Sequence, residues 1–372
     1  MKILNLFKDL KNSLLILIIL SSLIFFSCAP STRYPKISDQ LAKEEAERQK
    51  KIAIKEMMKL QKRLYRVSFP ILTQNAYFCS KNKTYLFGFL HLSARDKFPK
   101  GFKEIYTNLY ELEDHPKVIF VVPGSPAQKA GMMPGDVIML LNNKAPYSDF
   151  KSFRELLKEN KGNPYTFTVK RGGKLIDLKI SPVCACNYPV MLIQSDSVNA
   201  FTDGKRVYIS SGLMRFLQSD NELALVIGHE LAHCVMNHIS KQMGNTLIGG
   251  ILGALATVLT GVDMTRVGME AGRFAFSQEF EAEADYVGCY LAARAGYDVS
   301  DAADIWRRIA VFHPEAINLK GSTHPSTAKR FIAIKKAAEE IKEKQRLGKP
   351  LIPEKRISEE KEAQKDDSED KF

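Results

Sequence analysis

The pentapeptide His229-Glu230-Leu231-Ala232-His233 constrains this chain of 372 residues more than any other feature. Two histidines four positions apart on a helix leave the same face one turn apart, which suits two of the three protein ligands of a catalytic zinc. Glu230 cannot reach the same ion, but it can reach a water bound to it, where a general base for peptide hydrolysis must lie. The pentapeptide therefore predicts a zinc peptidase with His229 and His233 as ligands and Glu230 as the base.

The sequence around the pentapeptide indicates a helix. Residues 219–222, Ser-Asp-Asn-Glu, have the form of a capping box, and the apolar residues after them predict a buried helix. His238 lies about 140° round a continuous helix from His233, so we expect a surface or capping histidine there rather than a ligand. The longer metzincin pattern is excluded, because it needs glycine and histidine where this chain has Met236 and Ile239.

A second cluster of carboxylates runs from Glu279 to Asp285 on another helix-prone stretch. Glu281 and Asp285 share one face, so one of them can complete the metal site while the other accepts the outer N–H of a ligand histidine. Glu279 and Glu283 share a different face and are expected to meet solvent. The alternative for the cluster is an acidic helix surface without a metal.

Across residues 190–345 the chain resembles the gluzincin family of HtpX, the mitochondrial inner-membrane Oma peptidase and the CAAX-prenyl endopeptidases (metallopeptidase family forty-eight). Besides the two motifs, the resemblance rests on Asn199-Ala200-Phe201, Tyr208-Ile209-Ser210-Ser211-Gly212-Leu213, Gly288, Ala295-Gly296-Tyr297-Asp298, and Thr323-His324-Pro325 with Arg330. The resemblance implies that His229, His233 and Glu281 ligate zinc, that Glu230 is the base, and that Asp285 orients a ligand histidine. HtpX and the prenyl endopeptidases cross the membrane several times, so this chain is more similar to the family's soluble, lipid-anchored envelope members.

The same resemblance leaves the roles of His324 and Arg330 open. Either could donate to the carbonyl oxygen of the scissile bond, on which negative charge develops. Alternatively, His324 could bind zinc as a fourth ligand and silence the site. In the simplest case Pro325 ends a loop and Arg330 makes a surface salt bridge.

The middle of the chain resembles a PDZ domain of the bacterial protease-associated type. The resemblance rests on a strand at Val118–Val122, turns at Pro123-Gly124 and Gly135-Asp136, a strand at Val137–Leu141, a helix at Phe153–Leu157 and a strand at Tyr165–Val169. Such domains bind peptide C-termini as an added strand at the sheet edge. The loop Leu86-Phe87-Gly88-Phe89 would hold the terminal carboxylate, since glycine permits close backbone approach. Alternatively, Gly88 marks only a bend in a strand.

The N-terminal residues form a predicted targeting segment. Three lysines precede an apolar run from Leu14 to Phe26, and Ser27-Cys28 follows, which resembles a bacterial lipoprotein signal with Cys28 acylated. An uncleaved N-terminal anchor is the alternative. Because Ala29 follows the cysteine, the resemblance to lipoprotein sorting in Gram-negative bacteria favours the outer membrane, with the catalytic domain facing the periplasm.

The predicted fold class is α+β, with a mainly helical gluzincin metallopeptidase domain, a small edge-stranded sheet and a preceding β-rich, PDZ-like domain. The predicted order is a signal peptide at 1–28, a charged helical stalk or docking helix at 29–78, the PDZ-like domain at 79–186, the peptidase domain at 187–346 and a charged, disordered tail at 347–372.

Two further segments of the predicted peptidase domain have candidate roles. Val207–Ser210 is the best candidate for an edge strand along which an extended substrate could lie. The apolar segment from Leu247 to Val262 is short for a membrane span. It predicts a helical lid or a membrane-touching loop, with a core helix as the alternative.

Cysteines and charge add weaker constraints. A bond from Cys79 to Cys184 or Cys186 would tie together the two ends of the middle domain. Cys234 and Cys289 lie in the predicted catalytic helices and are expected to be buried free thiols. The formal net charge of +12 is spread along the chain without a nucleic-acid motif, so we expect a basic surface near an anionic membrane and no nucleic-acid partner.

Together these features predict a zinc endopeptidase of the bacterial cell envelope, with one Zn²⁺ per chain. Its substrates would be misfolded or unassembled envelope proteins, and its PDZ-like domain would bind peptide C-termini. The competing class is a chaperone or adaptor with a latent or structural zinc site. A structural site usually has four protein ligands and has no use for Glu230.

Overall fold

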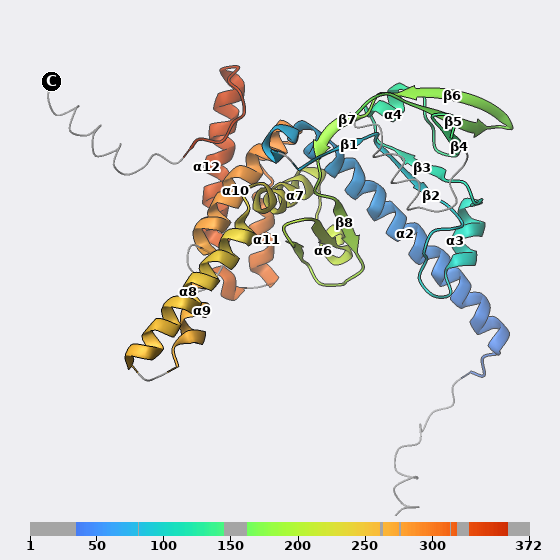
Figure 1. Cartoon of the computed structure of the whole chain (residues 1–372). Coiled ribbons are helices and arrows are strands. Elements are labelled where there is room, and N and C mark those ends of the chain that lie inside the picture. Colours follow the sequence, from blue (N-terminus) through green and yellow to red (C-terminus); the bar gives the residue numbers. More distant parts are fainter. Residues whose placement is uncertain are drawn as a thin grey trace, which may run out of the picture. The chain divides into compact units, whose positions relative to one another are not determined.

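The computed structural model describes residues 35–80, 82–144, 162–260, 263–274, 277–312, 314–317 and 327–355. The chain divides into two units, residues 1–49 and residues 50–372, and the second unit holds the sheets and nearly all the helices (Figure 1). The predicted lipidation site Cys28, the predicted helix Phe153–Leu157, His324 and the tail beyond 355 lie outside the described residues. Within the described ranges, no helix has the length and hydrophobicity that a bilayer span requires.

The long helix α2 (Asp39–Gln74) joins the core of the peptidase domain through its second half. Leu64, Val67 and Ile71 are fully buried there. Arg63 donates to the Asp220 carboxylate and to the backbone oxygens of Met214, Leu217 and Ser219. This guanidinium therefore bonds backbone oxygens at the junction between two helices of the peptidase domain. The second half of α2 thus packs against this core.

The PDZ-like part is an antiparallel five-stranded sheet in the order β2-β3-β4-β5-β6. The strands are β2 (Phe89–Leu92), β3 (Lys117–Val121), β4 (Val137–Leu141), β5 (Tyr165–Arg171) and β6 (Lys174–Ile180), accompanied by the helices α3 (Lys103–Tyr110) and α4 (Pro126–Lys129). Phe87, Phe89, Tyr165 and Phe167 contact one another edge to face or tilted in its core. The three predicted strands are confirmed, and β2 is an outer strand of the sheet as far as the structure describes it.

The chain passes so close to Ser125 at position 88 that only glycine fits there. Its φ is +88°, and a Cβ built there would lie 2.2 Å from Cβ of Ser125. Its carbonyl oxygen accepts hydrogen bonds from the Val122 amide and the Ser125 hydroxyl. Phe87 and Phe89, the residues on either side of it, are buried in the domain core.

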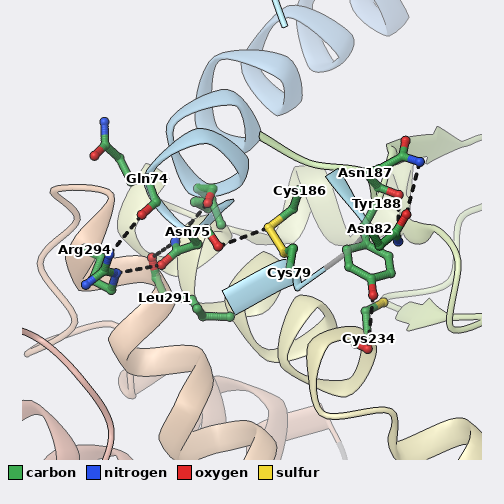
Figure 2. The surroundings of a disulfide bond; sticks show 11 residues. Gln74, Asn75, Cys79, Asn82, Cys186, Asn187, Tyr188, Cys234, Leu291 and Arg294 are labelled. Carbon is green, nitrogen blue, oxygen red and sulfur yellow. Dashed lines mark hydrogen bonds between the residues drawn. A yellow bond between two sulfur atoms is a disulfide. The ribbon is translucent and has the colours of Figure 1, made fainter. Parts of the chain in front are cut away.

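A small two-stranded sheet connects the ends of the PDZ-like part. It pairs β1 (Lys83–Leu86) with β7 (Val183–Cys186), and the 3-10 helix η1 (Ala76–Cys79) precedes it. Cys79 and Cys186 form a disulfide (Figure 2), whereas Cys184 is free. Of the two pairings that the sequence allowed, the structure has Cys79 with Cys186.

The peptidase part combines a three-stranded sheet with a set of helices. The sheet order is β8 (Val190–Ile193), β10 (Val207–Ser210) and β9 (Ala200–Thr202). The helices are α6 (Ser211–Phe216), α7 (Asp220–Val235), α8 (His238–Thr260), α9 (Thr265–Phe274), α10 (Ser277–Arg294), α11 (Asp304–Phe312), the 3-10 helix η2 (Pro314–Ile317) and α12 (Thr327–Arg346). The fold class is α+β, as predicted.

The prediction that Val207–Ser210 is an edge strand is wrong. β10 pairs parallel with β8 on one side and antiparallel with β9 on the other. Both of its edges therefore carry hydrogen bonds, and among the described strands the outer ones of this sheet are β8 and β9. β9 also packs against α7, the helix that carries the pentapeptide.

The apolar segment after the pentapeptide is helical and pairs with its neighbour. α8 and α9 pack together as a hairpin, which projects from the other helices of the peptidase part in Figure 1. Five large apolar side chains of α8 are more than half exposed: Met243, Leu247, Ile248, Ile251 and Leu252. This exposure contradicts the core-helix alternative for these positions.

Candidate metal centre

The helix α7 begins and is buried as its sequence indicates. The Ser219 hydroxyl accepts the Glu222 amide, as in a capping box. The Glu222 carboxylate accepts the Gln218 amide and pairs with Arg308 at 2.7 Å. The helix that follows is buried along most of its length, so the pentapeptide lies in the domain core.

Two glycines let α7 and α10 cross in near contact. A Cβ added at Gly228 would lie 2.4 Å from the carbonyl oxygen of Gly288. A Cβ added at Gly288 would lie 2.7 Å from the amide nitrogen of His229 and 2.8 Å from its Cα. This crossing brings Glu281 and Asp285 of α10 beside the histidines of α7.

We therefore expect Gly288→Ala to damage both stability and metal binding. The added methyl group would meet backbone atoms, which cannot turn away as a side chain can, so the helices must separate at a cost of about 1–3 kcal/mol. Thermal unfolding followed by circular dichroism and the bound zinc per chain would measure the two effects.

Gly244→Ala is the matched control for this change. Gly244 lies exposed in α8, and a Cβ there meets nothing within 4 Å. Helix propensity predicts a slightly stabilised protein, by up to about 1 kcal/mol. If both alanine variants melted and bound zinc alike, the close crossing would not be what positions the site.

His229, His233 and Glu281 form a group that could hold a metal ion. The two Nε2 atoms are 3.2 Å apart, Oε2 of Glu281 is 3.6 Å from Nε2 of His229, and Oε1 is 3.4 Å from Nε2 of His233. Three tetrahedral ligands at zinc distances would be separated by about 3.3 Å, and nitrogen and carboxylate oxygen are ligands that zinc takes. The three side chains therefore fit a zinc ion, with a fourth position left for water.

The imidazole of His229 is held by a buried ion pair. Its Nδ1 is 2.9 Å from Asp285, which receives two hydrogen bonds from Arg330. Burial alone would raise the pKa of Asp285, but the charge of Arg330 holds that pKa well below its usual range. Arg330 also stacks on Trp306, with Cζ 3.6 Å from the ring centre. The surface salt bridge considered for Arg330 is wrong, because the pair is buried.

The imidazole of His233 is held by a second pair that the sequence did not indicate. Its Nδ1 is 3.0 Å from Nδ1 of His238, whose Nε2 is 2.7 Å from the Glu283 carboxylate. His238 is only 2% exposed and its two ring nitrogens meet the side chains of His233 and Glu283, so neither the surface role nor the capping role predicted for it fits. Glu283 meets solvent as expected, since its side chain is 40% exposed, but its carboxylate also bonds the buried His238.

The error over His238 has a local cause. The prediction extended one straight helix through residue 238, but α7 ends at Val235 and α8 begins at His238. Between them Asn237 has φ of +56°, a left-handed conformation that asparagine tolerates and that commonly ends a helix. The chain therefore turns, and His238 faces back towards His233. Asn237 was the one available signal.

The other predicted site residues lie as follows. Glu230 is buried on α7, next to His229 and outside the group of three. Nη1 of Arg330 is 3.8 Å from Glu281, so its charge lies beside the ligand group. Cys234 and Cys289 are buried free thiols, as predicted, and burial raises the pKa of Cys234 to about 11. Such a thiol is protonated at neutral pH and is a poor metal ligand.

Comparisons with known families match two regions of the chain. Peptidase family M48 matches residues 176–338, and the PDZ domain matches residues 105–181. The mitochondrial metalloendopeptidase OMA1 of Arabidopsis thaliana is 33% identical over 147 residues, which cover 39% of this chain and 30% of that protein. The beta-barrel assembly-enhancing protease of Escherichia coli K12 is 31% identical over 121 residues, 29% of this chain and 25% of that protein.

The similarity to these relatives is thus confined to less than a third of their length. Among solved structures, the HtrA3 PDZ domain bound to a phage-derived ligand covers 28% of this chain and 88% of its own, at 23% identity and a TM-score of 0.22. Residues 176–338 of this chain thus match peptidase family M48, and the residues that match a PDZ domain precede most of them.

Proposed function

We propose that this chain is a zinc-dependent endopeptidase of the bacterial cell envelope. The observation that carries the proposal is the group formed by His229, His233 and Glu281, with Glu230 buried beside it. Three ligands and an adjacent carboxylate suit a catalytic site better than a structural one, which usually has four protein ligands. The metalloendopeptidase and protease named among the relatives support the same reaction.

Each site residue has a distinct part in this proposal. His229, His233 and Glu281 would hold the zinc ion, which when bound would supply Lewis-acid chemistry for activating water. Glu230 would accept a proton from the water that attacks the peptide carbonyl and would return it to the leaving amine. Asp285 fixes the tautomer of His229 by accepting its Nδ1 proton, and Arg330 keeps that carboxylate charged.

We assign the extended substrate to the edge of β9 rather than to β10. β9 packs on α7 and is an outer strand among the described residues, and a peptide can add to such a strand through main-chain hydrogen bonds. Phe201 of β9 is 44% exposed, and its ring stacks on that of Tyr208 with 4.9 Å between the ring centres. It gives this edge an apolar face for a substrate side chain.

We further propose that the substrates are misfolded or unassembled envelope proteins. One relative is named a beta-barrel assembly-enhancing protease, which supports this class. The PDZ domain would bind their C-termini at the edge of β2, next to Leu86-Phe87-Gly88-Phe89. Acylation at Cys28 would anchor the protein in the outer membrane, with its catalytic domain facing the periplasm.

Zinc analysis with a proteolysis assay tests the central proposal. We expect the purified chain to bind one zinc, to cleave unfolded casein, to lose this activity with a chelator and to regain it with Zn²⁺ but not with Mg²⁺. Zinc binding without cleavage would favour the chaperone or adaptor class. A chain that holds no zinc would contradict both.

A further inference from the structure

We propose that His238 and Glu283 are positioning residues that fix His233 in the tautomer and orientation needed to bind the metal. The inference rests on the proposed metal site and assigns two further residues to it. In this proposal each ligand histidine is held by its own pair of residues. Asp285 and Arg330 hold His229, whereas His238 and Glu283 hold His233.

The geometry allows one assignment of protons along this chain of groups. Nε2 of His233 faces the ligand group, so it must carry the free electron pair, and the proton lies on Nδ1. Nδ1 of His233 therefore donates to Nδ1 of His238, at 3.0 Å. Nε2 of His238 then carries its own proton and donates to Glu283, at 2.7 Å. Each donor meets an acceptor, and the ligating nitrogen of His233 stays free for the ion.

The ring of His238 is held in place from several sides. It is 2% exposed and stacks on Phe280, with 4.8 Å between ring centres and an angle of 21° between the planes. Asn237 sets the turn that aims it at His233. Such a ring cannot rotate freely, so it presents its acceptor to His233 in a fixed direction.

The helix α10 supports both ligand histidines from separate positions. Glu281 supplies a metal ligand, Asp285 contacts His229, and Glu283 contacts His238 at the start of α8. The two supports differ in exposure, since the side chain of Asp285 is 3% exposed and that of Glu283 is 40% exposed. Because His238 is the first residue of α8, the orientation of His233 depends on the position of the start of that helix.

The test compares two replacements of His238 in the full chain. His238→Phe keeps a flat ring against Phe280 but removes the acceptor. His238→Asn can place an amide oxygen where Nδ1 now lies. We expect the Kd for Zn²⁺, measured by competition with a chromophoric chelator, to rise about 10- to 100-fold in the phenylalanine variant. The asparagine variant should regain most of that affinity, and kcat should fall more than KM rises.

Changes in α10 complete the test. Glu283→Leu removes the second acceptor and should weaken zinc binding, whereas Glu283→Gln keeps an acceptor oxygen and should weaken it less. Glu279→Gln is the matched control, because Glu279 is an exposed residue of the same helix one turn away. It should leave the Kd unchanged.

Three results would overturn the inference. The first is equal zinc affinity in the parent and in His238→Phe. The second is equal loss in the phenylalanine and asparagine variants. The third is a lower melting temperature with no change in zinc affinity. A parent protein that binds no zinc would instead show that the proposed metal site is wrong, so the two failures are distinguishable.

Discussion

Replacing Glu230 by glutamine should lower kcat/KM for casein by about 10²- to 10⁴-fold while the protein still binds one zinc. Glutamine has nearly the same size but cannot accept a proton from water. Glu230 is not one of the three grouped ligands, so the metal should stay. Because Glu230 is buried on α7 beside His229, the neutral replacement should not disturb the fold.

The measurement needs both activity and metal content. Casein cleavage is followed over hours, because the expected residual rate is small, and zinc is quantified on the same samples. Glu279→Gln, the same change at an exposed position of α10, controls for loss of a carboxylate and should keep full activity. A Glu230→Gln protein with full zinc and more than a tenth of the parent rate would remove Glu230 from the mechanism.

The ligand group could be predicted because it depends on spacing within single helices. His229 with His233, and Glu281 with Asp285, are each four residues apart, and both pairs lie on one face of a continuous helix. The structure keeps both helices intact over these residues. Periodicity pairs Glu281 with Asp285 but pairs Glu279 with Glu283 equally well, so the choice of the first pair for the metal site also needed the resemblance to the metallopeptidase family.

What the sequence could not show depends on breaks and crossings between elements. The prediction for His238 was wrong because it assumed one continuous helix from His233 to His238, whereas the chain turns at Asn237. β10 was taken as an edge because pairing partners cannot be read from one strand alone. Gly288 was noted only as part of a motif, whereas its reason is a contact with the backbone of His229. The choice between Cys184 and Cys186 likewise needed the three-dimensional path of the chain.

The bond between Cys79 and Cys186 should contribute about 4 kcal/mol to stability. It joins residues 107 positions apart, and closing so long a loop removes much of the conformational freedom of the unfolded chain. The folded state has other links at the same place (Figure 2). Asn75 donates to the Leu291 carbonyl, and Arg294 donates to the Asn75 side chain and to the Gln74 carbonyl.

These hydrogen bonds join the end of α2 to α10 without the disulfide, so its removal should act mainly on the unfolded state. We therefore expect Cys79→Ser combined with Cys186→Ser to unfold at lower urea concentration yet to keep zinc and casein cleavage at 25 °C. The single tryptophan, Trp306, lies against Arg330 and reports on the peptidase domain by fluorescence. Cys184→Ser is the control and should unfold like the parent. A double variant with parental stability, or one that loses zinc while still folded, would contradict the expectation that the disulfide acts mainly on the unfolded state.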